Sequence, residues 1–145
     1  QNEKVSLSLV HKRWSQGEAG KVVIEDLHRT AAIDPNALAE PETLFLSSLA
    51  LSTLPAADLF ALYQAWIDRL AELEAASITG SFTLPTSAEH STILRDGLAN
   101  HARLQYELVT LRNQAAKEKQ LNRRVELNMM IKRLETELAE LKTTL

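Results

Sequence analysis

The chain has 145 residues, of which 45% are apolar and 24% charged, so it is long enough for one ordinary domain and too apolar to be wholly disordered. Its net charge of -3 excludes a uniformly basic nucleic-acid-binding protein, and the lack of cysteine excludes disulfides and thiolate metal sites. Charge is uneven, because residues 1–80 contain 6 Lys+Arg and 11 Asp+Glu, whereas residues 81–145 contain 10 and 8. We therefore expect two parts of different character.

A β-hairpin is predicted near the N-terminus. Val5 to Val10 alternates apolar and polar residues, as a half-buried strand does, and Lys21 to Glu25 is a second strand candidate. The stretch between them contains two glycines and predicts a turn that pairs His11 with Ile24. Because an isolated hairpin is marginal in water and the chain starts with Gln1 rather than Met, we expect it to begin inside a larger domain.

Few side chains of this part have the pattern of a reactive site. Trp14, beside Lys12 and Arg13, is interpreted as packing onto the hairpin rather than as an exposed recognition tip. Glu25 and Asp26 could bind magnesium in a nuclease, but without a nearby lysine and a third acid they are interpreted as solvent-facing. The four histidines are too scattered for a zinc site. The sequence predicts no catalytic residue, no metal site and no cofactor.

Two helices are predicted next, each with a proline at its start, where a missing N–H costs a helix nothing. The first, Pro41 to Leu51, has leucines on all sides, which indicates a buried helix. The second, Pro55 to Ala76, carries apolar residues at helical spacing that we expect to form the main core. These are Leu59, Leu62, Tyr63, Trp66, Leu70 and Leu73.

A long helical element is predicted from Thr86, because Thr86 and Glu89 match a capping box and no Gly or Pro occurs after Gly97. The predicted organisation is a small α+β domain over residues 1–85, incomplete at its N-terminus, and a helical coiled-coil element over residues 86–145. The predicted fold class is α+β and mainly α: a small β-hairpin plus helices, then a long C-terminal helix or coiled coil.

A coiled-coil seam is predicted near the C-terminus from apolar residues in steps of three and four. The residues predicted to bind a partner are Leu127, Ile131, Leu134, Leu138 and Leu141. A second seam, out of phase with the first, consists of Leu104, Leu108, Leu111 and Ala115. Either one continuous helix contains a phase break, or the chain reverses near residues 117–123, where Asn122 is the best-placed turn residue.

The continuous helix is the favoured alternative, because Gly, Pro and a Ser or Thr cap are absent between Arg112 and Glu126. A lone helix of this length would leave its leucine seam exposed. We therefore expect a homo-oligomer or a helical protein partner to cover the seam.

The phase break is also the most basic stretch of the chain. Its cations, the candidates for contact with nucleic-acid phosphates, are Arg112, Lys117, Lys119, Arg123 and Arg124. Glu118 and Glu126 offset them in part. Because no aromatic residue is interleaved for base stacking and no recognised motif surrounds the stretch, a solvated helix face is the favoured interpretation.

Three stretches resemble the C-terminal part of a bacterial family of unknown function. They are VSLSLVHKR (Val5–Arg13), LSTLPAADLFALYQAWIDRL (Leu51–Leu70) and KEKQLNRRVELNMMIKRLETEL (Lys117–Leu138). Members of that family are commonly encoded beside helicases and DNA methyltransferases in restriction-like and phage-defence clusters, and carry further sequence before the segment equivalent to Val5. The resemblance implies a context rather than a mechanism.

The function expected from these patterns is that of a non-enzymatic interaction or assembly subunit of a bacterial DNA-processing system, acting through the C-terminal coiled coil. Its partner would be a second copy, a helicase or a methyltransferase. The alternatives are a nucleic-acid-binding accessory protein that uses the patch at 112–124, and a nuclease whose active site precedes Gln1. Because no charged and apolar leader or bilayer-spanning run occurs, a cytoplasmic protein is expected.

Overall fold

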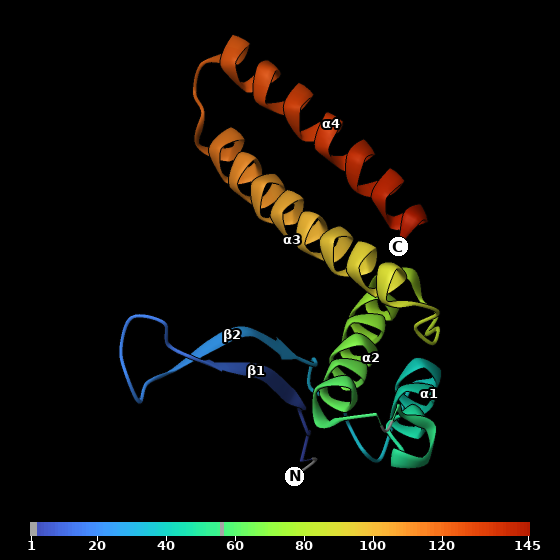
Figure 1. The fold of residues 1–145 in the computed structure, drawn as a ribbon. Helices are drawn as coiled ribbons and strands as arrows, with labels where there is room; N and C mark the ends of the chain where they lie inside the picture. The colour runs from blue at the N-terminus through green and yellow to red at the C-terminus, as the bar shows by residue number, and fades with distance from the viewer. Residues whose placement is uncertain (1–2, 56) are drawn as a thin grey trace. The chain divides into compact units, whose positions relative to one another are not determined.

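The computed structural model describes residues 3–55 and 57–145, and over these residues it confirms the α+β, mainly α fold class. The chain divides into two compact units, Gln1–Ser91 and Thr92–Leu145. The first contains strands β1 (Ser8–Trp14) and β2 (Val22–Arg29), helices α1 (Glu40–Ser48) and α2 (Leu59–Thr79), and a 3-10 turn η1 (Leu51–Thr53). Helix α3 (Ala88–Lys117) begins in the first unit and continues in the second, which ends with α4 (Leu121–Thr144) (Figure 1).

Strands β1 and β2 form a two-stranded antiparallel sheet. Lys12 pairs with Ile24, so the prediction that His11 pairs with Ile24 was wrong by one residue. The loop closes through a hydrogen bond from the Ser15 N–H to the Lys21 carbonyl, so the turn is centred on Glu18 rather than between Gly17 and Glu18. Because side chains alternate between the faces of a strand, a shift of one residue exchanges the two faces.

The core of the first unit joins the sheet to α1 and α2. Ile33, Phe45 and Leu70 form its buried centre, with partly buried residues packed around them. These are Leu7, Leu9, Leu49, Leu73 and Phe82. Of the six residues predicted as the core stripe of α2, Leu70 is buried, whereas Leu59 is 80% and Tyr63 40% exposed. Similarly, α1 buries Phe45 but exposes Leu44 and Leu46, so it is not buried on all sides.

Helices α2 and α3 begin at side-chain caps that set their bounds. The Asp58 carboxylate accepts the Ala61 N–H at 2.7 Å, so α2 begins four residues after Pro55 rather than at that proline. It ends at Gly80, whose φ of 93° is a left-handed conformation that glycine adopts at no steric cost. For α3 the hydroxyl of Ser87 accepts the His90 N–H at 3.0 Å, and the predicted cap at Thr86 was therefore wrong.

The second unit is an antiparallel helical hairpin, so the favoured prediction of one continuous helix was wrong and the alternative of a reversal is confirmed (Figure 1). Three residues separate α3 from α4, and Asn122 lies within α4 rather than in the turn. The Glu118 carboxylate accepts the Gln120 N–H at 2.8 Å, which supplies the local hydrogen bond that a Gly or Asn turn would otherwise provide. Burial of the two seams against each other outweighs the lack of a strong turn residue.

Candidate interaction surfaces

The outer face of the β-hairpin, which we define as Val10, Lys12, Trp14, Val22, Ile24 and Leu27, is mainly apolar and exposed. Residues of β1 two apart share a face, and their cross-strand partners share it with them: Trp14 pairs with Val22, Lys12 with Ile24 and Val10 with Leu27. The exposed fractions are 72% for Trp14, 62% for Ile24 and 64% for Leu27. The interpretation that Trp14 packs onto the hairpin was therefore wrong.

The opposite face of the hairpin is tied to α2. The His11 ring stacks on Phe60 with a centroid distance of 4.8 Å, and its Nε2 lies 3.1 Å from the Gln64 amide oxygen. Leu9 packs against the core. The inner face is thus fixed by the rest of its unit. In Figure 1 the loop end of the hairpin, drawn in light blue, extends beyond α1 and α2.

The residues predicted to bind a partner through the C-terminal seam lie instead against the upstream seam of the same chain. Leu104, Leu108 and Leu138 form the buried centre of the helical hairpin, with Ile131, Leu134 and Leu141 packed against it. Leu127 is half-buried nearer the turn. Since the chain itself covers this seam, an outside partner is not needed to bury it, and its role in binding a partner stays a prediction. The outer surface of α4 still exposes Leu121, Val125, Met129 and Met130.

The five predicted phosphate-contacting cations separate into two groups. Arg112 reaches across to α4, where its Nη2 lies 2.7 Å from the Glu135 Oε1, so its charge is already matched. The reversal brings the other four to the turn end of the helical hairpin, which we call the basic tip: Lys117, Lys119, Arg123 and Arg124. All four are exposed, and among the described residues only Arg123 contacts an acid, Glu118, at 3.8 Å.

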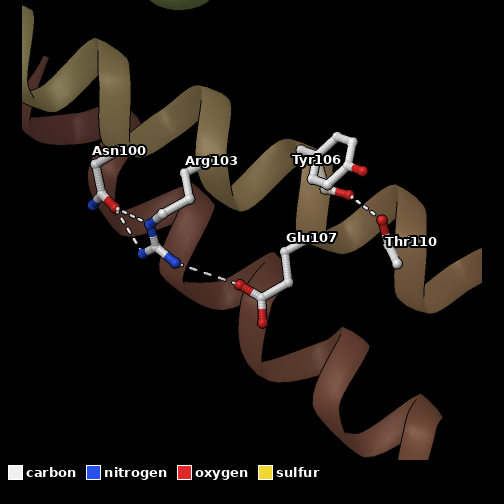
Figure 2. Close-up of polar contacts among 5 residues, drawn as sticks. All are labelled: Asn100, Arg103, Tyr106, Glu107 and Thr110. Atoms are coloured by element: carbon white, nitrogen blue, oxygen red, sulfur yellow. Dashed lines mark hydrogen bonds and ion pairs between the residues drawn. The ribbon is translucent and has the colours of Figure 1, made fainter.

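The middle of α3 carries a solvated polar surface. Figure 2 shows Arg103 between Asn100 and Glu107 on one side of the helix, donating to Asn100 Oδ1 at 2.8 Å and to Glu107 Oε2 at 3.4 Å. The Thr110 hydroxyl donates to the Tyr106 carbonyl at 2.9 Å (Figure 2). Such contacts between residues three or four apart support the helix modestly and leave no group poised for chemistry.

A small buried polar cluster lies where α2 meets the start of α3. Glu72 is 3% exposed and accepts the Thr83 hydroxyl at 2.9 Å, while its other oxygen, Oε1, is 3.5 Å from His90 Nδ1. Within the described residues, Oε1 and Nδ1 are both buried without a hydrogen-bond partner, as is the Ser91 hydroxyl. Burial raises the pKa of the Glu72 carboxyl, against the opposing effects of Thr83 and His90.

A second buried charge, Arg69, lines a pocket in the first unit. The residue is 9% exposed, and burial lowers the pKa of its guanidinium while neighbouring Asp68 raises it. Neither Arg69 nor Glu72 was among the residues predicted from the sequence. The signal was nonetheless present, because Arg69 lies three residues after Trp66 and four before Leu73, on the apolar side of α2 where a charge is unusual.

The side chains of Glu25 and Asp26 lie outside the described residues, so the magnesium-binding alternative is not addressed there. Among the residues that are described, no group of three or more His, Asp or Glu side chains is arranged to hold a metal ion. In the same part of the chain, no helix combines the length and apolar character needed to cross a membrane.

The described part of the structure presents two exposed candidate surfaces, the outer face of the β-hairpin and the basic tip. The chain belongs to the family described as "Domain of unknown function (DUF4391)", which matches residues 1–138. The match confirms the expectation that the chain belongs to a family of unknown function. No curated protein and no solved structure matches the chain significantly.

Proposed function

We propose that the protein is a non-enzymatic interaction and assembly subunit of a bacterial DNA-processing system, of the restriction-like or phage-defence kind, and that it binds a protein partner through the outer face of the β-hairpin. The observation that carries the proposal is the exposure of this face. The DNA-processing setting rests on the family resemblance alone.

The outer face has the composition of a protein interface. Aromatic residues are enriched in such interfaces, and Trp14 is the most exposed large side chain of the hairpin. A single exposed apolar residue needs no explanation, but here neighbours on two paired strands are exposed together. Both strands of the two-stranded sheet also lie at an edge, where free backbone groups can pair with a further strand.

The partner is a second copy of the chain, a helicase or a methyltransferase. Sedimentation velocity at several concentrations, alone and with each candidate enzyme, tests the proposal. We expect the double variant Trp14→Ser, Ile24→Thr to weaken the complex at least about tenfold, or about 1.4 kcal/mol. Leu59→Ser, which alters another exposed leucine outside the outer face, is the matched control. A strict monomer in every mixture contradicts the proposal.

A second candidate function, contact with nucleic acid, is favoured by the reversal that gathers the basic tip. Four exposed cations at one end of the helical hairpin can lie against phosphates more readily than cations spread along a helix. In fluorescence anisotropy with labelled duplex DNA, we expect binding near physiological salt to be lost with Arg123→Glu, Arg124→Glu. The control, Arg133→Glu, Lys142→Glu, makes the same charge change elsewhere on α4. Absence of binding even at low salt contradicts this function.

A further inference from the structure

The pocket beside Arg69 combines one positive charge with apolar walls. It has a volume of about 340 Å³, within the range of small-molecule sites. Its lining consists of Leu44, Ser47, Ser48, Thr53, Arg69, Phe82 and Leu84. All of these residues belong to the first unit, so the pocket is formed entirely within it. None of its lining residues belongs to the outer face of the β-hairpin.

Two hydrogen bonds hold the Arg69 side chain in place, but they use only some of its N–H groups. Its Nε donates to the Ser48 carbonyl at 3.1 Å, at the C-terminal end of α1, and its Nη1 donates to the Ala65 carbonyl at 2.9 Å. A guanidinium has five N–H donors, so these bonds use two. Among the described residues no carboxylate forms an ion pair with Arg69, although Asp68 attracts its charge, and its hydrogen bonds involve Nε and Nη1 rather than Nη2.

Burial of the Arg69 charge is costly, and the attraction of Asp68 offsets that cost only in part because desolvation is the larger effect. A ligand anion on the remaining N–H groups would offset it further. Carboxylate is the anion that fits, since a guanidinium can donate to it through two parallel hydrogen bonds. The three hydroxyl groups of the lining cannot help to bind an anion, because each already donates to a backbone carbonyl. A phosphate or sugar, which needs several donors, is therefore poorly served.

We propose that the Arg69 pocket binds a small monocarboxylate with an apolar body, its carboxylate on the free guanidinium N–H groups and its body against Leu44, Phe82 and Leu84. The competing account is purely structural, with Arg69 acting only to hold the last turn of α1. The two accounts differ in whether a negative charge on an added small molecule strengthens its binding to the pocket.

The test is an NMR titration of the full chain with hexanoate and, separately, with hexan-1-ol, which has the same apolar tail and no charge. We expect a saturable shift of the Arg69 Nε–Hε signal and of the Ser47 and Thr53 amides, with a Kd of about 1 mM or tighter. Hexan-1-ol should bind at least about tenfold more weakly. Equal binding of the two compounds, or no saturable shift with hexanoate, overturns the proposal.

Two variants separate recognition from folding. Arg69→Met should reduce hexanoate affinity at least about tenfold. Because that change also removes two structural hydrogen bonds, Leu84→Ser is the second variant: Leu84 is 56% exposed, so the fold should persist while hexanoate binds several-fold more weakly. Leu59→Ser, outside the pocket, should bind hexanoate as the wild type does. Unchanged affinity in Leu84→Ser, or an equal loss in Leu59→Ser, contradicts the assigned site.

Discussion

The two units distribute apolar and polar side chains differently. In the helical hairpin the leucine seams face each other, and its ion pairs, such as Arg112 with Glu135, lie at the surface. In the first unit several large apolar residues of the β-hairpin are exposed to solvent, whereas Glu72 and Arg69 are buried. An element whose seam is closed by its own chain is explained by folding alone. The buried charges distinguish the first unit more sharply than its exposed apolar residues do, because α4 of the helical hairpin also exposes apolar side chains.

The largest expected effect is in the helical hairpin. Leu104, 1% exposed, lies at the centre of its seam, so Leu104→Ala should lower the free energy of unfolding by about 2–5 kcal/mol through the cavity it leaves. Urea denaturation followed by circular dichroism measures this.

The matched change in the first unit is Ile24→Thr, at a position 62% exposed, and should change the free energy of unfolding by no more than about 0.5 kcal/mol. If Ile24→Thr destabilised the protein as much as Leu104→Ala, the outer face of the hairpin would be part of the fold rather than free for a partner, and the contrast between the units would fail.

The next effect is on pH dependence in the first unit. Because burial raises the pKa of Glu72 above the ordinary value of 4.5, the folded protein holds this proton more tightly than the unfolded chain. The contribution of Glu72 to stability is therefore fully present below pH 4.5 and is lost as the pH rises through the folded pKa. Asp68 acts in the same direction, while Thr83 and His90 oppose it.

Glu72→Gln removes this titration and keeps an oxygen that can accept the Thr83 hydroxyl. We expect the unfolding free energy of the variant, relative to that of the wild type, to increase as the pH rises from 4.5 towards neutrality. The exposed neighbour Glu74→Gln serves as the control and should show no such trend. Parallel pH profiles for wild type and Glu72→Gln would contradict a buried, partly unmatched carboxyl.

A smaller, stabilising effect is expected in the helical hairpin from Gly97→Ala. Glycine within a helix costs about 0.5–1 kcal/mol relative to alanine. The added Cβ would lie 2.8 Å from Cδ2 of Leu145, the far end of a flexible side chain, which can rotate away. We therefore expect a rise in the midpoint of urea unfolding. A fall would show that the Leu145 side chain is held too firmly to move away from the added methyl group.

The smallest effect is that of the surface ion pair between α3 and α4. Arg112 and Glu135 are about half exposed, and pairs of this kind contribute about 0.2–1 kcal/mol. A double-mutant cycle with Arg112→Ala and Glu135→Ala measures the coupling, which should decrease as salt is added. A coupling that is large and independent of salt would mean that this ion pair is shielded from solvent, so that the helical hairpin also contains buried charges.

Much of the fold could be predicted from the sequence, because it is recorded in local patterns. Alternation over Val5–Val10 predicted the first strand, which the structure places further along at Ser8–Trp14. Proline and helical spacing predicted α1 and α2, and the steps of three and four located both seams. The reversal between Lys117 and Leu121 was not favoured, because its stabilisation comes from contacts between residues far apart in the chain rather than from a turn residue.

The candidate sites were less accessible to sequence reasoning. The basic tip could be named residue by residue, but the pairing of Arg112 with Glu135 depends on the antiparallel register of the two helices. Trp14 was misassigned, although alternation along β1 places it on the face opposite Leu9, which packs against the core. Arg69 and Glu72 were missed. The place of Arg69 on the apolar side of α2 was a signal in the sequence, but how deeply the two residues are buried depends on the packing of α2 against neighbouring segments.

The closed seam of α3 and α4 has a consequence for how the chain behaves on dilution. A coiled coil made by two chains comes apart as its concentration falls, so its melting temperature depends on how much protein is present. Here both halves of the seam belong to one molecule, and the local concentration of one helix around the other is set by a three-residue connection. The helical hairpin therefore stays assembled even in a cell that contains only a few copies of the protein.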